Sequence, residues 1–177
     1  LSKIAAVLVI GFGIYFYTTT LDTTSNTIVA QQKSIVLPDA SQVNLNSKST
    51  ITYNTSNWDS NRQLTLVGEA FFKVAKGKKF DVKTNEGTVS VLGTQFNIKQ
   101  RDDYFEVICY EGKVAVKSKT KTTTLLQGDT FLIIDGKYIA TEKENLLRPT
   151  WLTNKSTFRS IPYREVIKEF ERQYNVS

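Results

Sequence analysis

Between residues 34 and 141, apolar and polar residues alternate in short runs that are separated by turn-forming residues. A period of two places successive side chains on opposite faces of a strand, so each run predicts a half-buried β-strand. The turn signals recur about every 8 to 12 residues, as is typical of an antiparallel sandwich or barrel. We therefore predict that residues 34–141 form an all-β domain, an antiparallel β-sandwich or β-roll of about eleven short strands.

Six residues mark predicted turns within this domain. Pro38 and Asp39 follow the first run, and this pair is a strong turn signal. Four glycines each stand between two strand-like runs: Gly68, Gly93, Gly112 and Gly128. A lone glycine in that position suits a sharp corner or a bulge with positive φ. None of them belongs to a GxGxxG or GxxxxGK[ST] loop, so a structural role is favoured over ligand binding.

The N-terminal segment is strongly apolar, and residues 4–21 carry no charge over eighteen positions. A helix of that length covers about 27 Å, close to the hydrocarbon thickness of a bilayer. We therefore predict a transmembrane helix over residues 1–21, with Lys3 favouring a cytoplasmic N-terminus. A signal-peptide apolar region and a buried core helix remain as alternatives. Residues 22–33 are polar and are interpreted as a tether that leads into the first strand.

The C-terminal part changes pattern after a charged connector at residues 142–150. Trp151 and Phe158 are spaced like a short strand or hairpin, and helical periodicity follows from Pro162 to Tyr174. The apolar positions of that helix share one face: Tyr163, Val166, Ile167, Phe170 and Tyr174. Residues 151–177 are interpreted as the start of a truncated α+β domain in a longer protein.

Composition excludes several kinds of chemistry. The chain has no histidine and one cysteine, Cys109, which excludes a disulfide within the chain, Cys/His zinc sites and histidine-dependent hydrolases. Cys109 has the inward parity of its strand and is expected to be buried and inert. The neighbouring carboxylates Asp102 and Asp103 are expected to point apart in a turn. We predict no enzymatic activity, no metal and no cofactor.

The net charge of +6 is spread along the chain, and its tightest cluster is Lys76, Lys78 and Lys79. Nucleic-acid binding usually requires a basic stripe or patch. The lysine cluster is interpreted instead as a solvated hairpin loop between two strands, and no nucleic-acid partner is expected.

Several motifs occur in an order that resembles the FecR family of anti-sigma factors. The segment Val36–Ser47 (VLPDASQVNLNS) resembles the family's LPDGSxVxLNxxS opening. The other matching segments follow in sequence: Gly68–Ala75, Phe80–Thr84, Val91–Ile98, Tyr110–Val116, Leu126–Gly128 and the Trp151–Val176 region. The resemblance covers about residues 34–177. Ala40 and Asp129 depart from the family pattern, at turn positions.

The resemblance implies a single-pass inner-membrane protein whose C-terminal region is periplasmic. Such proteins bind an extracytoplasmic-function (ECF) sigma factor through a cytoplasmic N-terminal segment, which we expect to be missing here. They receive a signal from the signalling domain of a TonB-dependent outer-membrane transducer. The partner interface is predicted at the C-terminal aromatic residues: Trp151, Phe158, Tyr163, Phe170 and Tyr174.

Two other functions remain open at this stage. A tethered periplasmic module that binds a ligand or glycan is the first alternative, in which an exposed Trp58 would stack on a sugar. A hydrolase is the second, and it would need a deep pocket with two carboxylates about 5 to 10 Å apart.

Overall fold

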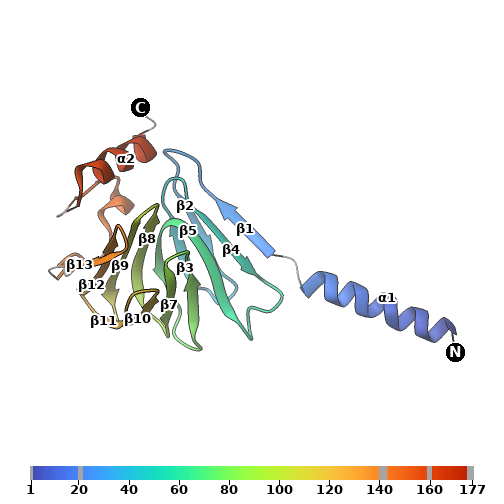
Figure 1. Cartoon of the computed structure of the whole chain (residues 1–177). Helices are drawn as coiled ribbons and strands as arrows, with labels where there is room; N and C mark the ends of the chain where they lie inside the picture. Colours follow the sequence, from blue (N-terminus) through green and yellow to red (C-terminus); the bar gives the residue numbers. More distant parts are fainter. Residues whose placement is uncertain (1, 20–21, 140–142, 159–160, 175–177) are drawn as a thin grey trace.

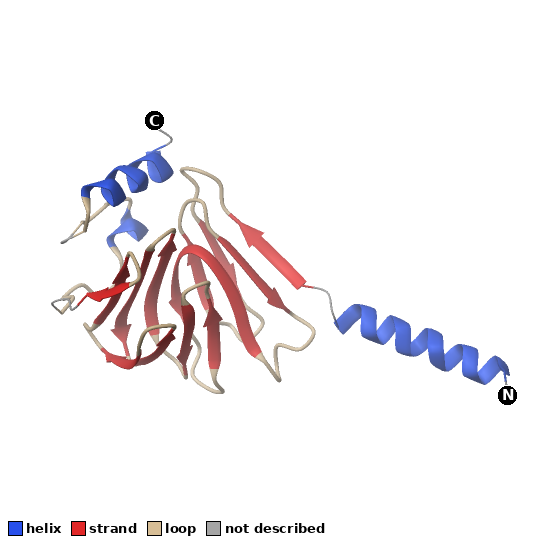
Figure 2. Ribbon diagram, in the orientation of Figure 1, coloured by secondary structure: helices blue, strands red, loops and turns tan. Residues whose placement is uncertain are grey.

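The structure is a computed structural model that describes residues 2–19, 22–139, 143–158 and 161–174. Thirteen strands form one continuous sheet, which curls into a half-barrel (Figures 1 and 2). The mainly β class is therefore confirmed. The strands form one curled sheet and not the two separate sheets of a sandwich. Helix α1 (Ser2–Thr19) projects away from the sheet, and helix α2 (Tyr163–Tyr174) lies at its other end.

The strands follow one another with short connections. In chain order they are β1 (Asp22–Asn26), β2 (Lys33–Val36), β3 (Gln42–Leu45), β4 (Thr50–Asn54), β5 (Arg62–Lys73), β6 (Phe80–Lys83), β7 (Gly87–Val91), β8 (Gln95–Arg101), β9 (Tyr104–Glu111), β10 (Lys113–Ser118), β11 (Thr122–Leu126), β12 (Thr130–Ile134) and β13 (Lys137–Ile139). A short 3₁₀-helix, η1 (Thr150–Thr153), precedes α2.

Strand β5 is the centre of the sheet because it pairs with four neighbours. Its first half pairs with β4 and β6, and its second half pairs with β3 and β8. Strand β1 extends the sheet beyond β4, and β2 extends it beyond β3. On the other sides the order continues through β7, β10 and β11, and through β9, β12 and β13.

The bend of β5 at Gly68 corrects two predictions. The sequence pattern predicted that a strand ends at Gly68, but β5 continues through it, with a φ of +107° at the glycine. The bend lets the chain return through residues 74–79, so that β6 pairs parallel with the first half of β5. Arg62 holds this return by donating to the carbonyls of Lys78 (2.6 Å) and Ala75 (3.0 Å). The predicted hairpin loop is therefore a crossover, and the sheet is not purely antiparallel.

The other predicted turn residues lie between strands. Pro38 and Asp39 connect β2 to β3, and Asp39 also forms an ion pair with Arg62. Gly93, Gly112 and Gly128 lie in the β7–β8, β9–β10 and β11–β12 connections, each with positive φ.

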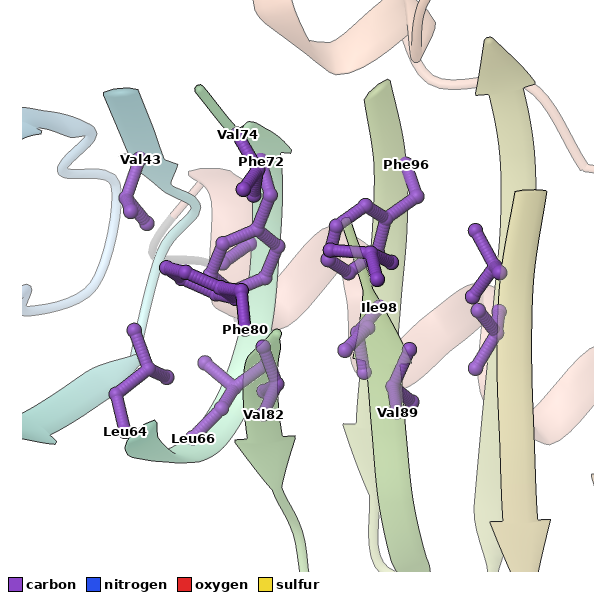
Figure 3. Packing of buried hydrophobic residues seen from close by; sticks show 14 of the residues in the cluster. Val43, Leu64, Leu66, Phe72, Val74, Phe80, Val82, Val89, Phe96 and Ile98 are labelled. Carbon is purple, nitrogen blue, oxygen red and sulfur yellow. The ribbon is translucent and has the colours of Figure 1, made fainter. Parts of the chain in front are cut away.

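The core fills the concave side of the curled sheet (Figure 3). Phe72 stacks on Phe96 with their ring centroids 4.9 Å apart, and the edge of Phe80 packs against Phe72. Cys109 is completely buried, and burial raises the pKa of its thiol to about 11, as expected for an inert cysteine. Trp58 is also buried in this core, between Tyr53 and Phe80. The prediction of an exposed Trp58 available to a sugar is therefore wrong.

The two ends of the chain differ from their sequence predictions. A helix occupies the N-terminal apolar segment, and its side chains from Ile4 to Tyr17 are exposed. The described residues contain no helix with both the length and the apolar character needed to cross a membrane, so they do not support the predicted spanning helix. The predicted tether contains β1, which pairs with β4. Trp151 lies in η1, where a strand or hairpin was predicted.

Candidate functional site

Helix α2 lies over the outer surface of the sheet with its polar face inward. Pro162 precedes it, Glu165 lies in its first turn and Arg172 in its last turn, so the charges complement the helix dipole. Glu165 and Glu169 are its two buried residues, and Glu169 is only 2 % exposed. The apolar face of the helix therefore faces outward.

The helix is held against the sheet by ion pairs. Glu169 accepts from Lys99 of β8 at 2.8 Å and from Arg172 of its own helix at 3.0 Å. Lys99 lies on the outer surface because strand side chains alternate and the neighbouring Ile98 faces the core. Closer to solvent, Lys168 pairs with Asp102 of the β8–β9 turn at 3.1 Å.

Glu69 of β5 is the centre of the buried polar network beneath the helix. Its two carboxylate oxygens accept from the side-chain amides of Asn46 (2.9 Å) and Asn97 (3.0 Å). Lys99 lies 3.9 Å from Glu69 and so connects this residue to Glu169. The indole N–H of Trp151 donates to Asn97 at 3.3 Å, which joins η1 to the same network.

The charges of the network shift one another's pKa values. Burial raises the pKa of Glu169, but Lys99, Arg172 and Arg101 outweigh burial and lower that pKa to about 2. Burial lowers the pKa of Lys99, but Glu69 and Glu169 outweigh burial and leave that pKa raised. For Glu106 of β9 burial prevails, so its pKa is raised. Glu169 and Lys99 are therefore a charged pair at neutral pH.

We expect Glu169 to stabilise the fold above about pH 4.5 and to lose that effect as the pH falls toward 2. A carboxyl whose pKa drops from 4.5 to about 2 on folding stabilises by about 3 kcal/mol when ionised. Urea unfolding of the wild type and of Glu169→Gln should therefore differ at pH 6, and most of that difference should be lost at pH 2.5. Glu171→Gln, an exposed change on the same helix, is the control. An equal difference at both pH values would show that the charge of Glu169 does not matter.

A small polar cavity lies between the helix and the sheet, with a volume of about 120 Å³. Its walls include Glu69, Lys99, Glu106, Trp151, Phe158 and Glu169. That volume holds about four water molecules at about 30 Å³ each, whereas small-molecule sites usually exceed about 300 Å³. No group of three or more potential metal ligands occurs within residues 2–19, 22–139, 143–158 and 161–174. The cavity can hydrate the buried charges, but it is too small for a substrate site.

Four apolar side chains of α2 form an exposed row that we call the outer stripe: Tyr163, Ile167, Phe170 and Tyr174. Tyr163 is 77 % exposed and Phe170 is 42 % exposed. Phe170 packs on Tyr174 and on Phe158, with centroid separations of 5.5 and 5.7 Å. The structure thus places four of the five predicted interface aromatics together. Trp151 is separate from them, because it is buried against Phe71 and Tyr110.

Sequence reasoning missed the charged residues that hold α2. No role was predicted for Glu69, Lys99 or Glu169, since charged residues on the polar side of a helix or strand are mostly exposed. One signal was available: Glu165, Glu169 and Arg172 share a face of the helix, and Asn97 and Lys99 share the outward parity of one strand. Two polar faces of this kind can bury each other when their charges match.

The comparisons with known proteins agree with this architecture. The profile of the FecR protein family matches residues 23–115, which is more than half of the chain. This chain belongs to the FecR family. The matched region extends from β1 into β10 and includes the bend at Gly68 and the network residues Asn46, Glu69, Asn97 and Lys99.

Two solved structures resemble this FecR protein over most of its length. Both are of a candidate anti-sigma factor from Parabacteroides distasonis ATCC 8503. One is 30 % identical with a TM-score of 0.80, covering 88 % of this chain and 76 % of the other. The second is 29 % identical with a TM-score of 0.79, covering 86 % and 75 %. No curated protein sequence matches this chain. FecR proteins are regulators and not enzymes, in agreement with the sequence prediction.

Proposed function

We propose that this protein is an anti-sigma factor that controls an ECF sigma factor through protein–protein contact. The membership in the FecR family, together with the similarity to a candidate anti-sigma factor, is the observation that carries the proposal. The sigma factor would be bound on the cytoplasmic side of the inner membrane, and the β body would lie in the periplasm.

The outer stripe is the surface that we propose for receiving the signal. Exposed aromatic side chains grouped on one helix face provide large contact areas, and such residues dominate many interfaces. Tyr163, Ile167, Phe170 and Tyr174 remain exposed while α2 is docked, so a partner can reach them without unfolding the protein. The proposed sender is the signalling domain of a TonB-dependent transducer.

Membrane attachment through residues 4–21 is the remaining part of the proposal. Large apolar side chains on α1 are between 60 and 72 % exposed from Ile4 to Tyr17. Water-soluble surfaces rarely expose apolar patches of this extent, whereas a bilayer would cover them. The full chain should therefore float with liposomes in a density gradient, and a chain that begins at Asp22 should not.

Deletion of the gene tests the proposed regulation in the cell. We expect transcripts of a small set of operons to change in the deletion strain and to return when the gene is restored. If no transcript depends on the gene, the anti-sigma proposal is wrong.

The outer stripe is tested by the double variant Ile167→Ser/Phe170→Ser in the restored gene. If the two side chains together contribute about 1.4 kcal/mol or more to binding, their loss weakens partner binding at least tenfold. Induction of the transcripts that depend on the gene should then fall strongly. Both side chains are partly exposed, so the free energy of unfolding should change by less than about 1 kcal/mol. The control is Val36→Ser/Leu92→Ser, which removes exposed apolar residues elsewhere. Normal induction in the stripe variant would exclude this surface.

A further inference from the structure

Two segments that are far apart in the sequence meet beside helix α2. The backbone N–H of Ala30, in the β1–β2 connection, donates to the carbonyl of Arg172 at 3.0 Å. The side-chain amide of Gln32 donates to the carbonyl of Trp151 at 3.1 Å. Figure 1 shows this connection beside the C-terminal end of α2. The C-terminal helix thus contacts the segment that leads back through β1 to α1.

A chain of hydrogen bonds and ion pairs through the buried polar network also connects the end of β1 to α2. At the end of β1, the hydroxyl of Thr27 donates to the carbonyl of Asn46 at 2.6 Å. Asn46 donates to Glu69, and Lys99 links Glu69 to Glu169 of α2. The path from β1 to α2 therefore consists of polar contacts between buried or nearly buried groups.

Strand β1 is held mainly by its pairing with β4. It pairs with β4 alone among the described strands, and the side chains of Asp22, Thr24 and Asn26 are exposed. An edge strand with little apolar burial opens more easily than the central strands of a sheet. Beyond its end, Thr27 bonds to Ser49, and α2 adds a contact to Ala30 in the connection that follows.

Helix α2 is itself held in a way that permits release. Twelve residues form a marginal helix in isolation, and this one is docked by ion pairs rather than by its apolar face. A partner on the outer stripe need not compete with the docking contacts, because the two faces of the helix are opposite. A partner that moves α2 away from the sheet would break the ion pairs on the inner face of the helix.

We propose that α2 is a displaceable strap that holds the β1–β2 connection in place and, through it, the membrane-proximal strand β1. Release of the strap loosens residues 22–32, next to the segment proposed to enter the membrane. The identity of the partner that releases it rests on the proposed function, but the coupling between α2 and β1 does not.

Amide hydrogen exchange of the full chain in lipid nanodiscs tests the coupling without any partner. Glu169→Gln weakens the Lys99 pair, so exchange in residues 163–174 should rise at least tenfold. Because the same variant lowers the global stability, exchange in β8 and β9 also rises, and if α2 holds β1, exchange in residues 22–32 should rise several-fold more than that of β8 and β9. Glu171→Gln, at an exposed site of the same helix, should change neither segment.

Three results would overturn the proposal: faster exchange in α2 with residues 22–32 unchanged, unchanged exchange in both segments, or an equal effect of Glu171→Gln. If Glu169→Gln speeds exchange in β8 and β9 as much as in residues 22–32, the surface variant Arg164→Gln/Lys168→Gln separates the coupling from the loss of global stability. It removes the exposed pairs with Asp135 and Asp102 and the pairs of both side chains with Glu165, and it leaves the contacts among Glu69, Lys99 and Glu169 in place. Joint loosening of α2 and residues 22–32 in that variant supports the strap, and loosening of α2 alone refutes it. None of these results depends on the sigma factor, so failure here leaves the transcription test unaffected.

Discussion

Replacing Lys99 with methionine is expected to lower the free energy of unfolding by about 3–5 kcal/mol. The ammonium group lies 2.8 Å from Glu169 and 3.9 Å from Glu69, and the side chain is only 14 % exposed. Methionine fills a similar volume, but it removes the cation paired with Glu69 and leaves Glu169 paired with Arg172 alone. An uncompensated buried charge is among the most destabilising changes that a single substitution can make.

The control for this prediction is Lys79→Met. Lys79 is also 2.8 Å from a carboxylate, that of Asp81, but its side chain is 65 % exposed. Exposed pairs contribute about 0–1 kcal/mol, so this variant should unfold at nearly the wild-type urea concentration. Equal urea midpoints for the two variants would mean that the Lys99 network does not stabilise the fold.

Gly68→Ala is the second change with a large expected effect. A Cβ atom at Gly68 would lie 2.8 Å from the Cα atom of Ser49 and 2.8 Å from the guanidinium of Arg101, and φ is +107°. Backbone strain costs about 1–3 kcal/mol, and overpacking costs about 1–3 kcal/mol more. We therefore expect a loss of about 3 kcal/mol or more in unfolding free energy, measured by urea denaturation.

Gly136→Ala separates backbone strain from crowding. Gly136 also has positive φ, at +72°, but a Cβ atom there would meet nothing within 4 Å. The unfolding free energy of this variant should fall only by the strain of the left-handed backbone conformation, about 1–2 kcal/mol. If Gly68→Ala is no worse than Gly136→Ala, the close approach of β5 to Ser49 and Arg101 is not a constraint on the sheet.

The sequence predicted the β body well because alternation reports directly on a half-buried sheet. The runs around Phe72, Phe96 and Val107 all became strands with those side chains in the core. The crossover after β5 could not be predicted in this way, since local pattern does not show which strands become neighbours. Only the bend at Gly68 makes a parallel pair possible across six connecting residues.

The orientation of α2 could not be predicted from the helix pattern alone. An amphipathic helix is assumed to bury its apolar face, which holds when the surface beneath it is apolar. Here the outward side of β8 presents Asn97 and Lys99, so the charged face of the helix is the better match. The helical period had placed Tyr163, Phe170 and Tyr174 on one face of the helix. The contact of Phe158 with Phe170 and the burial of Trp151 were not predicted.

Binding of the full chain, in lipid nanodiscs, to purified signalling domains of TonB-dependent transducers from the same genome tests the relay most directly. We predict saturable binding to at least one domain, weakened at least tenfold by Ile167→Ser/Phe170→Ser and unchanged by Val36→Ser/Leu92→Ser. Absence of binding to every domain, or equal binding by the stripe variant, would contradict the account.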